Sequence, residues 1–178
     1  TREFRIAVTP ANQNRVFIYF GTRSTTPNSV RLEMSDDAGA TWTNRGTVSN
    51  NAGGLDPGQF GYNTYLAASP TDANTVYVGS RDVFRSTDGG VTFTDISTAF
   101  APPWPNGAYT PDNQKFHSDQ QSFAFQPASG TTFYCGGDGG LWRTHRPGRS
   151  QVPGFLDDYA QVALGLHVLY LATRAHRH

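Results

Sequence analysis

Two short stretches decide the fold: Ser-Asp-Asp-Ala-Gly-Ala-Thr-Trp at residues 35–42 and Ser-Thr-Asp-Gly-Gly-Val-Thr-Phe at residues 86–93. Both fit the pattern Ser-x-Asp-x-Gly-x-Thr-aromatic. The aspartate can accept hydrogen bonds from backbone N–H groups one to three residues on, and the glycine tolerates the positive φ of a tight hairpin. The threonine begins the next strand, and the aromatic ring packs in the layer beneath. The positions that define these turns are Ser35, Asp37, Gly39, Trp42, Ser86, Asp88, Gly90 and Phe93.

A second pattern, a strand followed by a proline turn and another strand, occurs three times. Its prolines, Pro10, Pro70 and Pro127, are 60 and 57 residues apart (70 − 10 and 127 − 70). Each proline ends a strand because it cannot donate to the strand ladder. The β-branched and aromatic runs that follow are typical of buried strands.

Four short strands per repeat at a near-constant period predict β-propeller blades. The expected fold is all-β, with about three blades at roughly residues 4–46, 64–98 and 120–146, inside a repeat region of residues 1–148. Closed rings have about four to eight blades. The chain is therefore expected to be a fragment of a larger propeller, to complete a ring with further copies by self-association through its open edges, or to cover an edge with its tail.

The two turns resemble the Asp-box (BNR repeat) of sialidases, sortilin-type receptors and secreted xyloglucanase-like glycosidases, all of which are β-propellers. Residues 136–144, Gly-Gly-Asp-Gly-Gly-Leu-Trp-Arg-Thr, resemble the segment that precedes the box in these families. The third box is missing, since Arg146 stands at the aspartate position. The resemblance covers about residues 4–144. It implies that the box is a structural hairpin remote from the active face, and that the protein is extracellular, although Thr1 begins inside a blade with no signal peptide.

Residues 149–178 follow another pattern and predict one helix over about residues 152–175. Asp157 and Asp158 lie in its first turn and Arg174 at its end, which suits the helix macrodipole. This tail resembles a helix of the α/α-barrel part of bacterial thioredoxin-domain proteins, which are related to sugar 2-epimerases. That resemblance implies a composite chain, in which propeller repeats are joined to a piece of an unrelated reading frame.

Composition excludes several classes of partner. The net charge is zero, which implies neither nucleic acid nor a membrane surface as partner. No apolar run approaches the length of a membrane span. The single cysteine, Cys135, excludes an internal disulfide and is expected to be a small buried hydrophobe. No zinc spacing, phosphate-binding loop or Gly-x-Ser-x-Gly elbow occurs, so neither a metal site nor a cofactor is expected.

The segment Phe-His-Ser-Asp-Gln-Gln at residues 116–121 is the strongest polar candidate, and it resembles a His-x-Asp-x-His segment of xyloglucanase-like repeats. In a strand, His117, Asp119 and Gln121 would share one face. His117 and Asp119 are the candidates for a metal or proton-transfer site, whereas Gln121 suits ligand binding better because an amide is a poor zinc ligand. The simpler interpretation is that all three fix the innermost strand by hydrogen bonds to neighbouring loops.

The connection 99–114 carries two aromatic residues held between prolines, Trp104 and Tyr109. These rings could stack on a sugar, or they could simply pack the loop onto the blades. Sialidase chemistry is disfavoured because the only glutamates, Glu3 and Glu33, suit no tyrosine nucleophile. Three hypotheses follow: a carbohydrate- or protein-binding propeller module, a glycoside hydrolase fragment of sialidase or xyloglucanase type, and a composite chain without evolved function.

Overall fold

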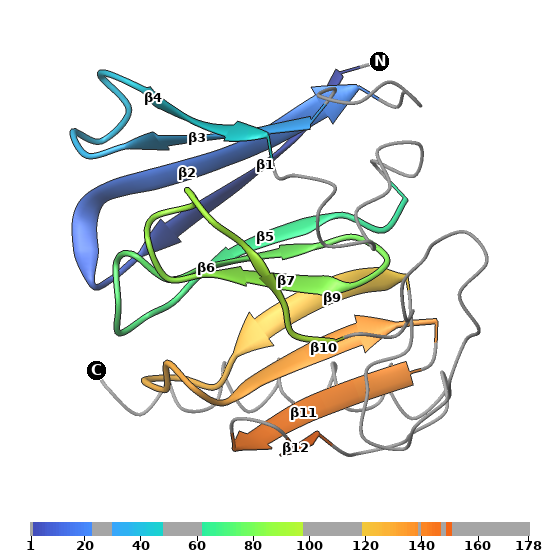
Figure 1. Ribbon diagram of the computed structural model, residues 1–178. Helices are drawn as coiled ribbons and strands as arrows, with labels where there is room; N and C mark the ends of the chain where they lie inside the picture. The colour runs from blue at the N-terminus through green and yellow to red at the C-terminus, as the bar shows by residue number, and fades with distance from the viewer. Residues whose placement is uncertain are drawn as a thin grey trace, which may run out of the picture.

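The computed structural model describes residues 2–22, 30–47, 62–97, 119–138, 140–146 and 149–150, which form three four-stranded antiparallel sheets (Figure 1). Blade 1 consists of β1 (Arg2–Thr9), β2 (Asn12–Thr22), β3 (Val30–Ser35) and β4 (Thr43–Thr47). Blade 2 consists of β5 (Tyr65–Ala68), β6 (Val76–Gly79), β7 (Val83–Ser86) and β8 (Thr94–Asp95). Blade 3 consists of β9 (Gln120–Phe125), β10 (Phe133–Gly137), β11 (Gly140–Arg146) and β12 (Arg149–Ser150).

Each blade is a simple meander in which consecutive strands pair antiparallel. Pro10, Pro70 and Pro127 all lie in the connection between the first and second strands of their blades, as the sequence predicts. The fourth strand of blade 3 reaches Ser150, a few residues past the expected boundary near 146, because β12 pairs with β11. The all-β prediction is confirmed for the part of the chain that the structure describes.

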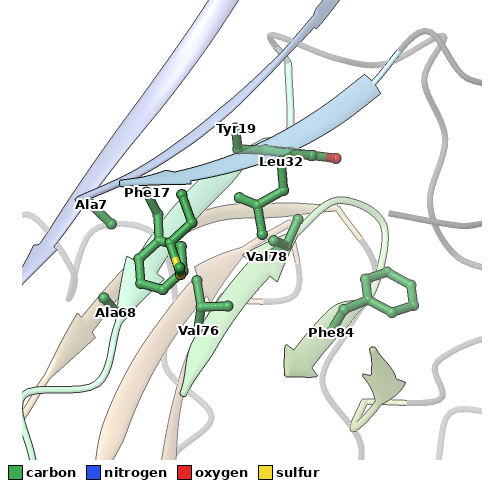
Figure 2. Close-up of a cluster of buried hydrophobic side chains, with 9 residues drawn as sticks. Ala7, Phe17, Tyr19, Leu32, Ala68, Val76, Val78 and Phe84 are labelled. Atoms are coloured by element: carbon green, nitrogen blue, oxygen red, sulfur yellow. The ribbon is translucent and has the colours of Figure 1, made fainter. Parts of the chain in front are cut away.

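The first strands of the blades lie side by side, β1 beside β5 and β5 beside β9, and the blades follow one another in chain order (Figure 1). Two apolar layers hold them together. In the layer between blades 1 and 2, side chains of both sheets point toward one another (Figure 2). Its buried members are Ala7, Phe17, Tyr19, Leu32, Met34, Ala68, Val76, Val78 and Phe84. The buried members of the layer between blades 2 and 3 are Tyr65, Tyr77, Val83, Phe133 and Cys135.

Strand alternation explains how blade 2 serves both layers. Successive side chains of a strand point to opposite faces. On β6, Val76 and Val78 therefore pack against blade 1, while Tyr77 between them packs against blade 3. All three side chains are at most 3% exposed. A sheet that is buried on both faces needs a continuous apolar run, which is what residues 76–78 supply.

Serine and aspartate side chains together hold the first turn motif. Asp37 accepts hydrogen bonds from the Thr41 backbone N–H (2.7 Å), the Thr41 hydroxyl (2.5 Å) and the Ser35 hydroxyl (2.7 Å). The Ser35 hydroxyl oxygen in turn accepts a bond from the backbone N–H of Gly39 at 2.8 Å. The carboxylate thus reaches a donor four residues on, farther than the expected one to three.

The second turn motif repeats this arrangement with Ser86, Asp88, Gly90 and Thr92. The aromatic positions of the two motifs differ. Phe93 packs against the layer between blades 1 and 2, as expected, whereas Trp42 remains 38% exposed. The expectation that both rings pack beneath their turns is therefore wrong for Trp42. The ring of Phe93 reaches the interface with blade 1, while Trp42 belongs to blade 1 itself, and no described blade precedes it.

The predicted tail helix over residues 152–175 lies outside the described residues. Among the residues that the structure does describe, no helix is long and apolar enough to cross a membrane.

Candidate functional site

Polar residues gather at one end of blades 2 and 3, where the first strands begin and the second strands end. We call residues 62–64, 80–82, 119–121 and 137–138 the mouth. The strand register places the mouth opposite the turn motifs. Tyr65 pairs with Gly79 at the mouth end of blade 2, whereas Ala68 pairs with Val76 at the turn end.

A buried amide fixes the first carboxylate of the mouth. The side-chain nitrogen of Asn63, a residue with 0% exposure, donates to Oδ1 of Asp119 at 2.7 Å. The backbone N–H of Asp119 donates to the carbonyl of Arg81 at 3.0 Å, and that of Gln120 donates to the carbonyl of Ser80 at 2.8 Å. Asp119 is thus held by blade 2 although it begins blade 3.

The backbone around Asp119 departs from regular strand geometry. Asp119 has φ 66°, a left-handed conformation that aspartate tolerates better than most residues. Beyond it, Gly137 pairs with Gln120 and Gly136 pairs with Ser122, so Gln121 is an extra residue, a β-bulge in β9. A bulge re-aims side chains, and here Gln120 is buried while Gln121 is exposed.

Gly137 is required by this geometry. A Cβ at Gly137 would lie 2.7 Å from the backbone oxygen of Asp119, closer than real Cβ contacts come. The same carbonyl accepts a hydrogen bond from the backbone N–H of Asp138 at 3.3 Å. The glycine therefore lets the two aspartate-bearing backbones lie side by side.

The second carboxylate of the mouth lies beside an exposed aromatic ring. The hydroxyl of Tyr62 donates to Oδ2 of Asp138 over a long 3.4 Å. The negative charge of Asp138 raises the pKa of the Tyr62 phenol, with smaller contributions from desolvation and from Asp119. Tyr62 is 53% exposed, so about half of the residue is accessible to a ligand.

The mouth therefore presents the carboxylates of Asp119 and Asp138, the amide of Gln121 and the exposed phenol ring of Tyr62 on one rim. Carboxylate and amide oxygens accept hydrogen bonds from hydroxyl groups, and an aromatic face suits the apolar face of a sugar ring. Within the described ranges, no group of three or more His, Cys, Asp or Glu side chains could hold a metal ion.

The structure places two of the sequence-predicted residues here, Asp119 and Gln121. Their regular alternation in one strand does not occur, because β9 begins only at Gln120 and bulges at Gln121. His117, Trp104 and Tyr109 lie outside the described residues.

Tyr62, Asn63 and Asp138 also belong to the site, although the sequence alone does not predict them as site residues. The usable signal is positional, since Tyr62 and Asn63 lie within three positions of the start of β5 and Asp119 lies one position before β9. Asp138 follows β10 within the Gly-rich segment that the sequence singles out.

Cys135 contributes packing and no reactive group to the mouth. It is fully buried in the layer between blades 2 and 3, with its sulfur 3.8 Å from the Tyr65 hydroxyl. Burial raises the pKa of the thiol to about 12, which keeps it protonated at neutral pH. The expectation of a small buried hydrophobe is confirmed.

Three consecutive four-stranded meanders, joined through adjacent first strands and packed face to face, define a β-propeller type of protein. The chain is 32% identical over 140 residues to a xyloglucanase of Hypocrea jecorina, an alignment that covers 74% of this chain and 16% of the relative. It is 34% identical over 116 residues to the xyloglucanase Xgh74A of Acetivibrio thermocellus, covering 60% of this chain and 14% of that protein.

A solved structure supports the same fold. The GH74 enzyme of Niastella koreensis superposes with a TM-score of 0.57 at 21% identity, covering 83% of this chain and 22% of that one. No protein-family model matches the chain. The chain spans less than a fifth of the length of the curated relatives named above.

Proposed function

We propose that the chain contributes a glycan-binding face to a xyloglucan-acting β-propeller, and that the mouth is that face. The observation that carries the proposal is the exposed ring of Tyr62 beside the carboxylate of Asp138, on the rim where Asn63 fixes Asp119. A sugar ring can stack on the phenol while its hydroxyl groups donate to the two carboxylates. The alignment with xyloglucanases supports a β-glucan as the ligand class.

The bulge and the buried Asn63 give this face a preorganised geometry. Because Asp119 is already fixed by blade 2, a ligand need not order it on binding, which reduces the entropic cost of association. Gln121, turned outward by the bulge, adds an amide that can both donate and accept. The same proposal includes an extracellular location, where plant polysaccharides occur.

Affinity electrophoresis of the 178-residue chain in gels that contain soluble xyloglucan tests this function. Retardation is expected, and Tyr62→Ala should reduce it at least several-fold. Trp42→Ala is the matched control, since Trp42 is another exposed aromatic but lies at the turn end. Migration unaffected by xyloglucan, or equal loss in both variants, would exclude the mouth as the glycan-binding face.

Hydrolysis is the second candidate function, favoured by the two carboxylates on one rim. Glycoside hydrolases use a pair of carboxyl groups that flank the scissile bond. Asp119 and Asp138 lie on adjacent backbones that share a hydrogen bond. Release of reducing ends from xyloglucan by the chain, abolished in Asp138→Asn, would establish hydrolysis. Binding without release would leave glycan recognition as the function of this chain.

A further inference from the structure

A serine and an aspartate are buried together beneath the mouth in blade 2. Asp82 lies in the connection between β6 and β7 and is 0% exposed, and Ser97, two positions after β8, is 2% exposed. The Ser97 hydroxyl donates to Oδ1 of Asp82 at 2.8 Å, and its oxygen accepts the backbone N–H of Val83 at 3.0 Å. One hydroxyl group therefore holds both a side chain and a backbone group at the end of this connection.

Ser97 is itself held in place by Asp95, the last residue of β8. Its backbone N–H donates to Oδ1 of Asp95 at 2.9 Å, and its hydroxyl oxygen lies 3.2 Å from the same carboxylate oxygen. The backbone N–H of Ile96 donates to the carbonyl of Val83 at 2.9 Å, which continues the pairing of β8 with β7. The fourth strand of blade 2 is thus followed by a fixed serine that contacts the connection between β6 and β7.

The same connection, residues 80–82, holds the start of blade 3 on its other side. Two of its carbonyl groups accept the backbone N–H groups of Asp119 and Gln120, at 3.0 Å and 2.8 Å. A hydrogen bond within the connection, from the backbone N–H of Ser80 to the carbonyl of Asp82 at 3.0 Å, makes it a compact turn. A serine beyond the fourth strand of blade 2 is therefore linked, through this turn, to the residue that carries the first carboxylate of the mouth.

A blade of this kind does not need a buried carboxylate to close. An ionised carboxylate loses its hydration on burial, and only hydrogen bonds or an opposite charge offset that cost. Blade 3 also joins its second and third strands by a short connection, and there the aspartate, Asp138, is exposed at the mouth. Blade 2 instead keeps the aspartate of its connection inside the protein, where Asp82 fixes the turn that holds Asp119.

We propose that Ser97 and Asp82 are positioning residues of the mouth, which fix the connection 80–82 and thereby set the position of the Asp119 carboxylate. Asp119 needs such support, because a φ of 66° is costly for a residue other than glycine. A carboxylate that is held in one place binds a sugar hydroxyl at a smaller entropic cost. The effect on ligand binding rests on the proposed function of the mouth, whereas the positioning itself can be measured without a ligand.

Hydrogen exchange of backbone amides in the 178-residue chain, followed by NMR, measures the positioning. Ser97→Ala removes the hydroxyl that holds the connection, so the amides of Asp119 and Gln120 should exchange about tenfold faster or more, relative to the amides of the β9–β10 ladder. Ser97→Thr keeps a hydroxyl and should exchange like the parent. Equal acceleration throughout blade 3, or none at these two amides, would overturn the proposal.

Ser86→Ala is the matched control at the turn end of the same blade. The Ser86 hydroxyl also donates to a carboxylate, Oδ1 of Asp88 at 2.7 Å, and its oxygen also accepts a backbone N–H, that of Gly90 at 2.8 Å. Ser86 is equally well buried, at 1% exposure. Its replacement should lower the free energy of unfolding without selective acceleration of the two mouth amides. Selective acceleration in this variant would show that those amides respond to any loss of stability in blade 2, and the assignment to Ser97 would fail.

Affinity electrophoresis in xyloglucan gels connects the positioning with ligand binding. Ser97→Ala should reduce retardation several-fold, whereas Ser97→Thr and Ser86→Ala should be retarded like the parent. Full retardation of Ser97→Ala despite faster exchange at Asp119 would contradict a role of the pair in binding. A parent that is not retarded would refute the glycan-binding function, and the exchange rates would still decide whether the pair positions Asp119.

A second variant serves if far-ultraviolet circular dichroism shows that Ser97→Ala does not fold. Asp82→Asn keeps an oxygen that can accept from the Ser97 hydroxyl but removes the charge, and hydrogen bonds to a charged acceptor are the stronger ones. A smaller acceleration, again confined to the amides of Asp119 and Gln120, is expected. Exchange at those amides that matches the parent would count against the proposal.

Discussion

The side-chain nitrogen of Asn63 donates to Oδ1 of Asp119 at 2.7 Å, joining two residues that are 56 positions apart. Asn63 lies two positions before β5 and Asp119 lies one position before β9, so the bond connects blade 2 to blade 3 at the mouth. Because the amide is fully buried and the carboxylate is partly buried, this contact both fixes the inter-blade geometry and orients a group that faces the proposed ligand.

Removal of that amide should destabilise the protein and the site together. Asn63→Ala leaves the Asp119 carboxylate without this buried donor, and such losses cost about 1–3 kcal/mol. The free energy of unfolding, from urea titration, measures the effect. Gln121→Ala is the control, since Gln121 is exposed and should change stability by no more than about 0.5 kcal/mol. Equal stability of the two variants would contradict the assigned role of Asn63.

The close approach of Gly137 to Asp119 predicts a steric effect. Gly137→Ala places a Cβ where only 2.7 Å separates it from the Asp119 carbonyl oxygen, so the backbone must shift. We expect a loss of about 1–3 kcal/mol, as in other overpacked positions, together with weaker xyloglucan retardation. Gly46→Ala serves as comparison. Gly46 has φ +89° but no atom within 4 Å, so that variant should lose stability without losing retardation.

The turn carboxylates predict a loss of stability in acid. Hydrogen bonds, the Thr41 hydroxyl first, lower the pKa of Asp37 from 3.8 to about 2, and similar bonds from Thr92 lower that of Asp88 further. Because the folded state favours the charged forms, their contribution is complete above the ordinary value of 3.8 and disappears as pH falls through the folded pKa. Melting temperature measured between pH 5 and pH 2 should fall accordingly.

Replacement of a turn aspartate separates this effect from general acid unfolding. Asp88→Ala removes the acceptor for the Ser86 hydroxyl and for both Thr92 donors, and by analogy with lost helix caps we expect a cost of about 1 kcal/mol at neutral pH. The decrease in melting temperature between pH 5 and pH 2 should also be smaller in this variant. Thr87→Ala, an exposed neighbour in the same turn, should leave both quantities unchanged.

Arg15 links blades 1 and 2 at the turn end. Its Nη1 donates to the Ala73 carbonyl and to Oδ1 of Asn74, both at 3.0 Å, while its Nε pairs with Asp36. We expect Arg15→Ala to lower the free energy of unfolding by about 1–3 kcal/mol. A lysine cannot reproduce the forked guanidinium contacts, so Arg15→Lys should lose most of the same amount. Gln13→Ala, an exposed position on the same strand, is the control in urea titrations. Full retention of stability in Arg15→Lys would show that charge alone suffices.

The repeat structure could be predicted because its determinants are local. A proline ends a strand by lacking an N–H group, and an Asp88-type carboxylate closes a turn within a few residues, so both act without the rest of the fold. The environment of Cys135 was predictable too, because a lone thiol in an apolar strand usually packs inside. The exposure of Trp42 could not be predicted, because Trp42 and Phe93 occupy the same position in the repeat. Only the neighbouring blade distinguishes the two.

The candidate site was predicted only in part, for the same reason. The sequence predicts Asp119 and Gln121 as polar residues that share one face of a strand, but the bulge that turns Gln121 outward depends on pairing with β10. Asn63 and Tyr62 carry only the signal of lying shortly before a first strand, because their partners in blade 3 are 56 and 76 positions away.

An all-β chain of about three repeated four-stranded units with carboxylate-closed turns follows from local sequence, because strand alternation, proline and hydrogen-bonding turn residues act over a few positions. Which polar groups meet at the mouth, and which apolar side chains of the described residues remain exposed, depends on how the blades pack. The Asn63–Asp119 bond forms only when blade 3 packs against blade 2. Phe4, Ile6 and Val8 are exposed because, among the described residues, no blade packs against their side of blade 1.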